Sequence, residues 1–182
     1  MQHGEAHHPG TGRSLFACAK EVLVLEGGKE RARLPYPVRE RIGAFLEGQG
    51  VYFGYSDGVQ HLQRLDPEAL ALTPIPLGGV FLRGKSDGQR LYVLLGDGRL
   101  QVREAREGRL LKEVRVSRPF PEMDEDTGGA IYPDIAPWPE RGLAYVSLPH
   151  LGLVAEVDVE RGRVVRYLRV GGSPTRLVLV RP

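Results

Sequence analysis

VLVLEGGKERARL (residues 22–34) consists of a β-rich run, a tight polar turn and a second β-rich run. The same pattern recurs as QHLQRLDPEALAL (60–72), LQVREAREGRLLKEV (100–114) and VAEVDVERGRVVRYL (154–168). The turn centres follow one another after 40, 40 and 54 residues, at Gly28, Glu68, Gly108 and Gly162. Alternation of apolar and polar residues in these runs favours strands over helices. The sequence therefore predicts four related β-hairpins.

Each hairpin is flanked by two further β-rich segments. The preceding segments are LFACA (15–19), VYFGY (51–55), LYVLL (91–95) and AYVSL (144–148). The following segments are RIGAFLEG (41–48), GVFLRGKSDG (79–88), AIYPDIAPW (130–138) and TRLVLVRP (175–182). Four-stranded units that repeat at about 40 residues are typical of propeller blades. We expect an all-β fold, a small β-propeller of four four-stranded antiparallel blades, with a β-sandwich as the alternative.

The chain ends suggest how the ring closes. Because the first unit supplies three strands and residues 175–182 supply one, we expect this last strand to complete the first blade beside Leu15–Ala19. Residues 13–182 would then form one propeller domain after a flexible, histidine-containing tail at residues 1–12. Closure of this kind hides strand edges that would otherwise pair with other chains. Two chains that combine into a larger ring are the alternative, so the oligomeric state stays open.

Composition excludes few classes of function. The 182 residues include 25 Lys and Arg and 23 Asp and Glu, a formal charge of +2, and basic and acidic residues are interspersed. We therefore expect no nucleic-acid partner, and no apolar stretch approaches the length of a membrane helix, so no membrane insertion is expected. Asparagine is absent and arginine outnumbers lysine, as in many thermophilic proteins. The location could be extracytoplasmic, with a signal peptide missing from this sequence, or cytoplasmic.

The last unit resembles a known repeat. AYVSLPHLGLVAEVDVERGRVVRYLRVGGSPTRLVLV (144–180) carries Tyr145-Val146, Val157-Asp158, Gly162 and Gly171-Gly172-Ser173-Pro174. These residues match the pattern of the YVTN-type β-propeller repeat, and SDGQRLYV (86–93) resembles the Asp-Gly link of that family. Leu148 stands where the family has asparagine. The resemblance implies the propeller fold and no single activity.

The loops at one end of the blades are the expected binding face. In propellers the connections between blades and between the second and third strands of each blade surround the channel. They would carry Asp57, Asp97 and His150, an acidic insertion within 117–129, and the aromatic Trp138; the acidic residues are Glu122, Asp124, Glu125 and Asp126. Clustered carboxylates also suit a hard cation such as Ca²⁺, although the spacing matches no Ca²⁺ loop.

Two other features suggest alternative functions. His3, His7 and His8 form the one cluster with transition-metal character, so Zn²⁺ or Cu²⁺ capture, as by a metallochaperone, is one alternative. A lactonase-like or hydrolase propeller enzyme is the other, although no nucleophile or phosphate-loop motif occurs. The leading hypothesis is a non-enzymatic binding or scaffold protein whose loop face contacts a protein or a small ligand.

Overall fold

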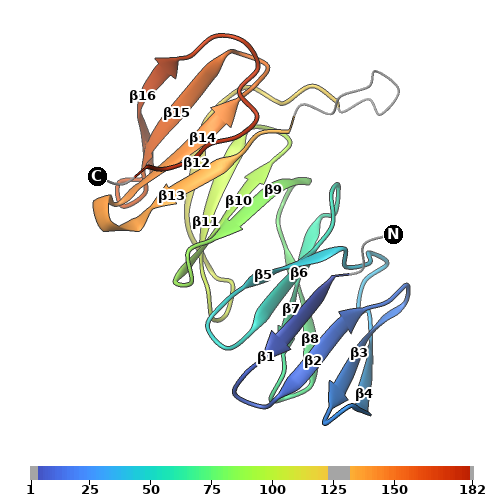
Figure 1. The fold of residues 1–182 in the computed structure, drawn as a ribbon. Coiled ribbons are helices and arrows are strands. Elements are labelled where there is room, and N and C mark those ends of the chain that lie inside the picture. Colours follow the sequence, from blue (N-terminus) through green and yellow to red (C-terminus); the bar gives the residue numbers. More distant parts are fainter. Residues whose placement is uncertain (1–3, 123–131, 181–182) are drawn as a thin grey trace.

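The computed structural model describes residues 4–122 and 132–180. Sixteen strands form four antiparallel sheets, and each sheet consists of four strands that are consecutive in the sequence. Figure 1 shows the sheets following one another along an arc, from the blue first blade to the orange and red fourth blade. The predicted all-β propeller fold of four blades is confirmed.

The first two blades span residues 5–76. Blade 1 contains β1 (Glu5–His8), β2 (Arg13–Ala17), β3 (Glu21–Glu26) and β4 (Lys29–Pro35). Blade 2 contains β5 (Ala44–Glu47), β6 (Tyr52–Tyr55), β7 (His61–Asp66) and β8 (Ala71–Pro76). The hairpin turns are tight because glycine supplies a positive φ, as at Gly28, where φ is 77°.

The last two blades span residues 81–169. Blade 3 contains β9 (Phe81–Ser86), β10 (Arg90–Leu95), β11 (Arg99–Glu104) and β12 (Leu110–Arg115). Blade 4 contains β13 (Ile135–Trp138), β14 (Leu143–Leu148), β15 (Leu153–Asp158) and β16 (Arg163–Arg169). A single turn of 3-10 helix, η2 (Pro139–Arg141), joins β13 to β14. No helix in the described part of the chain is long and apolar enough to cross a membrane.

The apolar core lies between the blades. One cluster joins blades 1 and 2 through residues such as Leu15, Val24 and Leu65. A second joins blades 2 and 3 around Phe53 and Phe81, and the third joins blades 3 and 4. Because successive side chains of a strand point to opposite faces of its sheet, each inner blade contributes to two clusters. Burying one such side chain contributes about 1.5–3 kcal/mol, so neighbouring blades hold each other in place.

The expected closure of the ring is wrong. Residues 5–8, assigned to a flexible tail, form β1 and pair with β2 in the register Ala6↔Leu15. Residues 175–180 belong to no strand, and Leu15–Ala17 of β2 pairs with β1 and β3 instead. Cross-strand bonds also reach Gly4, whose carbonyl accepts the Ala17 N–H at 2.8 Å. The first blade therefore already has four strands without the C-terminal segment.

The first and fourth blades lie at opposite ends of the arc (Figure 1). The contacts between strands of different blades join blade 1 to blade 2, blade 2 to blade 3, and blade 3 to blade 4. One face of blade 1 and one face of blade 4 are therefore without a neighbouring blade. The described chain is an open row of blades, whereas the sequence predicted a closed ring of four.

Candidate functional site

Three cavities open at the same end of the strands, where the connections between blades meet the β2–β3, β6–β7, β10–β11 and β14–β15 turns. We call this end the loop face. Cavity 1, of about 490 Å³, lies between blades 1 and 2, and cavity 2, of about 550 Å³, lies between blades 2 and 3. Cavity 3, of about 720 Å³, lies on blade 4. Volumes of this order are common for sites that bind small molecules.

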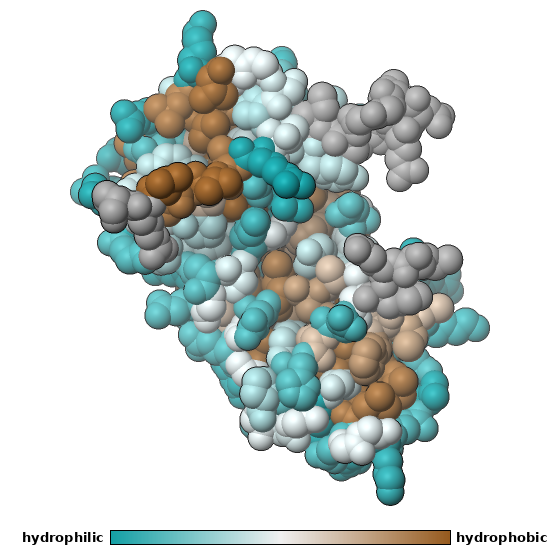
Figure 2. All heavy atoms as spheres, in the orientation of Figure 1, coloured by the Kyte–Doolittle hydropathy of each residue, from teal (hydrophilic) through white to brown (hydrophobic). Residues whose placement is uncertain are grey.

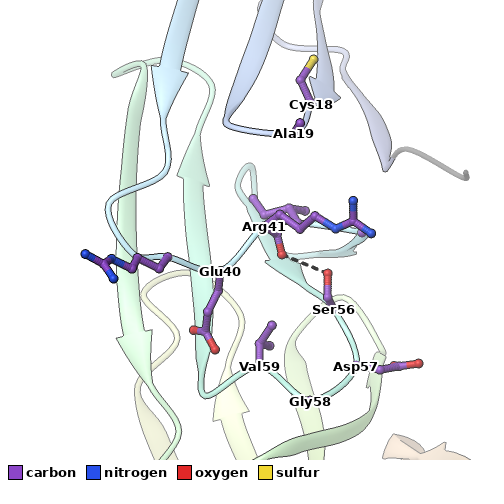
Figure 3. A pocket seen from close by; sticks show the side chains of 11 residues that line it. Cys18, Ala19, Glu40, Arg41, Ser56, Asp57, Gly58 and Val59 are labelled. Atoms are coloured by element: carbon purple, nitrogen blue, oxygen red, sulfur yellow. Dashed lines mark hydrogen bonds between the residues drawn. The ribbon is translucent and has the colours of Figure 1, made fainter.

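Cavity 1 is built from three connections. The β2–β3 turn supplies Cys18 and Ala19, and the β4–β5 connection supplies residues 39–43. The β6–β7 turn supplies residues 56–59, and Figure 3 shows these three segments around the cavity. The Ser56 hydroxyl donates to the Arg41 carbonyl at 2.9 Å and so joins two of the three segments.

Glu40 fixes the β4–β5 connection. One carboxylate oxygen lies 2.7 Å from His61 Nδ1, and the other accepts the Gln60 N–H at 2.6 Å. The Glu40 carbonyl also accepts from the Gln63 side-chain amide at 2.7 Å. Both oxygens of this carboxylate are thus used in holding the loop on β7, which leaves the arginines on either side of it and Asp57 of the β6–β7 turn as the other charged residues of the cavity wall.

Arg39 and Arg41 are exposed and line cavity 1. Within residues 4–122 and 132–180, neither guanidinium makes a hydrogen bond or an ion pair. Arginine presents five N–H donors in a planar fork that suits carboxylates and phosphates. Sequence reasoning missed both residues, because two arginines in a charged segment look like ordinary surface. The signal that could have found them is their position in a connection between blades.

Asp57, a predicted site residue, lines both cavity 1 and cavity 2. It lies on the β6–β7 turn, as expected, and its side chain is exposed. Figure 3 shows the carboxylate pointing away from Arg41. Asp57 therefore forms the rim that separates the two cavities.

Cavity 2 receives the beginning of the acidic insertion. Phe120, Pro121 and Glu122 line it together with Val80 and Phe81. Glu122 is thus placed on the loop face, whereas Asp124, Glu125 and Asp126 lie outside the described residues. Asp97 is near this cavity, but its carboxylate bonds the Arg99 side chain at 2.7 Å and the Arg99 N–H at 3.2 Å. Asp97 therefore stabilises its own turn.

His150 lies in cavity 3, on the predicted face. Its ring stands 4.5 Å from that of Phe120, and neither buried ring nitrogen makes a well-formed hydrogen bond to a described residue. Burial lowers the pKa of this imidazole, and the nearby Arg118 charge lowers it further. Through this ring contact, His150 packs the beginning of the insertion against blade 4.

Trp138 is not on the loop face, contrary to the prediction. It ends β13 on the side of the β13–β14 turn, whereas the loop face lies at the other end of that strand. The Arg141 guanidinium lies over the indole ring at 4.9 Å. The segment 130–138 was expected to be β-rich, but the strand within it begins only at Ile135, so Trp138 falls at its far end.

Two of the three histidines of the predicted metal-binding cluster lie in the described part of the chain. His7 and His8 are neighbours in β1, so their side chains point to opposite faces of the sheet. His7 contacts the Ser14 hydroxyl at 3.1 Å, and the buried His8 contacts the Thr11 hydroxyl at 2.8 Å. His3 lies outside the described residues. Among the residues described, no three His, Cys, Asp or Glu side chains are grouped so that they could hold a metal ion.

Comparison with solved structures shows β-propellers. The chain superposes on Citrobacter koseri AztD with a TM-score of 0.74 and 20% identity, over 95% of this chain and 48% of that one. It superposes on Kuenenia stuttgartiensis hydrazine synthase with a TM-score of 0.61 and 16% identity, over 93% of this chain and 49% of that one. For the dihydro-heme d1 dehydrogenase NirN in complex with DHE, the TM-score is 0.65 and the sequence identity is 13%, over 94% of this chain and 39% of that one.

These likenesses show the fold alone. The chain spans about half the length of the structures that it matches. No family model and no curated protein matches the sequence. The resemblance to the YVTN-type repeat therefore stays a prediction, as do the metal-binding and hydrolase alternatives.

Proposed function

We propose that the chain is a non-catalytic binding module whose loop face holds an anionic group of a protein or a small ligand in cavity 1. The observation that carries the proposal is the pair Arg39 and Arg41, two exposed residues in the wall of one cavity whose guanidinium groups have no partner among the described residues. Carboxylate and phosphate are the chemistries that such a pair would recognise.

The frame of the cavity supports this reading. Glu40 lies between the two arginines in the sequence, but its carboxylate is bonded to His61 and to the Gln60 N–H, so it leaves the guanidinium groups available. Because the loop is held on β7 before any ligand arrives, binding would cost little ordering of the backbone. The negative charge of Asp57 at the rim would repel an anion on the side toward cavity 2, so an anion would be held on the side of the arginines.

Backbone amide NMR tests the proposal with two probes, inorganic phosphate and a short peptide of glutamate residues. We expect saturable shifts at residues 39–43 and 56–59, and weaker binding at higher salt because the contacts are solvent-accessible. Arg39→Ala and Arg41→Ala should each weaken binding several-fold. Arg109→Ala is the matched control, since Arg109 lies in the β11–β12 turn on the opposite end of the strands.

Shifts that stay the same in Arg39→Ala and Arg41→Ala would contradict cavity 1 as the site. The absence of saturable shifts with either probe would contradict the anion-binding function. If only the peptide binds, the partner chemistry is a protein carboxylate; if phosphate binds equally well, the site recognises the anionic group alone.

A further inference from the structure

The two end faces of the row of blades are apolar and have no neighbouring blade. On blade 1, Phe16, Leu23 and Leu25 are half-buried, and none of them belongs to the core between blades 1 and 2. Phe16 and Leu23 pair across β2 and β3, so they form one patch. Figure 2 shows apolar side chains over the first blade and, at the other end of the molecule, over the C-terminal segment. Exposed patches of this kind often mark interaction surfaces.

The end face of blade 4 has the residues of an inter-blade interface. Tyr145 and Val154 occupy the places on β14 and β15 that Tyr92 and Leu100 occupy on β10 and β11. Tyr92 and Leu100 are part of the core between blades 3 and 4. Neither Tyr145 nor Val154 belongs to that core, so both are on the side where a further blade would pack.

Residues 175–180 lie along this face of blade 4. Figure 1 shows the dark red segment crossing β13 and β14, and the Leu177 N–H donates to Asp134 Oδ2 at 3.0 Å. Leu177, Val178 and Leu179 line a shallow cavity together with Ala136 and Tyr145. Leu177 and Leu179 are half-buried, whereas Val178 and Val180 are 84% and 83% exposed. This alternation is that of a strand with only one face covered. The segment thus lies where the inner strand of a fifth blade would lie.

The curvature of the row indicates how many blades a closed ring of this kind would contain. Nearly the whole chain follows the path of AztD, a propeller of which it covers 48%. A ring of that curvature needs about as many blades again, and a second copy of this chain supplies four. Two copies related by a two-fold axis would place blade 1 of each against blade 4 of the other, and both interfaces would then be satisfied.

We propose that a second copy of this chain completes the ring and that residues 175–180 join the copies. The segment takes the inner-strand place in blade 1 of the second copy and pairs with β2 there instead of β1. The segment and β1 cannot both occupy that place, and the segment fits it better. Residues 177–180, Leu-Val-Leu-Val, are all apolar and include two β-branched valines, while β1 reads Glu-Ala-His-His. Val178 and Val180 would then face the core beside Tyr52 and Leu65.

Mass measurement by light scattering tests the assembly on the full chain. We expect twice the chain mass of 20.1 kDa at micromolar concentration. The double variant Val178→Asp/Val180→Asp should be monomeric with an unchanged β-sheet circular dichroism spectrum. Val80→Asp is the control and should stay dimeric, because Val80 is exposed but precedes β9 in the middle of the row. A monomeric wild-type chain, or a dimeric double variant, would overturn the proposal.

Disulfide trapping tests the strand exchange. In the β1 register, Glu5 pairs with Phe16; if Leu177 replaces Glu5, position 175 comes opposite Cys18 of the second copy. Thr175→Cys should therefore form disulfide-linked dimers under mild oxidation, and Thr175→Cys/Cys18→Ser should not form this link. A disulfide within one chain, or none, would show that the segment does not exchange in this way.

Discussion

The Asp134 carboxylate accepts the backbone N–H of Leu177 at 3.0 Å, and this bond attaches the C-terminal segment to blade 4. Its other oxygen accepts the Ile135 N–H at 2.9 Å, and Arg83 and Lys85 of β9 lie 3.5 and 3.7 Å away. One buried carboxylate thus connects blade 3, blade 4 and the segment that follows blade 4.

Asp134→Asn should lower the free energy of unfolding by about 1–2 kcal/mol at neutral pH. An amide cannot accept both N–H donors, because one of its two ends is itself a donor. Urea unfolding of both proteins at neutral pH measures the loss. A variant as stable as the wild type would show that these bonds contribute nothing.

The effect of Asp134→Asn should depend on pH. Burial alone would raise the pKa of Asp134, but the N–H donors of Leu177 and Ile135 and the charges of Lys85 and Arg83 lower it below its ordinary value. The stabilisation is therefore fully present above the unfolded-state pKa of about 3.9 and is lost as the pH falls through the lower folded-state value. The stability difference between the two proteins should shrink in acid, and a constant difference would contradict this origin.

Gly98→Ala should destabilise the protein by about 3 kcal/mol or more, because two penalties add. Gly98 has φ of 94°, and a Cβ there would stand 2.1 Å from the Ser117 carbonyl oxygen. Gly88→Ala is the matched control: its φ is 88°, but a Cβ would meet nothing within 4 Å, so only the backbone penalty of about 1 kcal/mol applies. If Gly98→Ala and Gly88→Ala lower the free energy of unfolding equally in denaturant, the close approach of the Ser117 backbone to Gly98 is unimportant.

His150→Leu should weaken the pH dependence of stability between pH 7 and 5. Because burial lowers the pKa of His150, the unfolded chain takes up the proton first, and stability is lost as the pH falls through the ordinary histidine range. Leucine cannot titrate, and it also removes two buried nitrogens without good partners. Unfolding at both pH values measures the slope; an unchanged slope would mean that His150 does not contribute.

Cys18 should react with a thiol reagent in the folded protein. The residue is half-buried at the wall of cavity 1, and Figure 3 shows its sulfur directed away from Arg41 and Ser56. Modification should therefore proceed without global unfolding and be slower than in denatured protein. The rate at low denaturant concentrations should be insensitive to denaturant. A rate that rises with denaturant in step with unfolding would show that the thiol is not accessible from the cavity.

The turn residues of the sequence predicted the blades well. Glycine and aspartate fix turn geometry locally, so the hairpins around Gly28, Gly108 and Gly162 are where the repeat predicts them. The two ends were wrong for one physical reason. Glu5–His8 has low strand propensity and becomes a strand because β2 offers its edge, whereas residues 175–180 have high propensity and find no edge within this chain.

The sequence predicted where the candidate site lies better than it predicted which side chains are available there. Asp57 and His150 lie on the loop face because turns between strands are predictable, but side-chain partners are not. Sequence could not show that Asp97 is bonded to Arg99 or that Glu40 is bonded to His61 while the arginines beside it stay available. The sequence placed Trp138 at the wrong end of its blade, because the end at which it lies depends on the residue where β13 begins.

Because β1 rather than the C-terminal segment completes the first blade, every strand within this chain pairs only with its sequence neighbours. Such a molecule unfolds like a row of coupled units, and no strand forces the two ends to open together. In a single copy of the chain, such as the Val178→Asp/Val180→Asp variant, blades 2 and 3 are each covered on two faces and should retain their amide protons longest, and protection should decline toward blades 1 and 4. Only an additional strand contributed from outside this row would make the whole array unfold in one step.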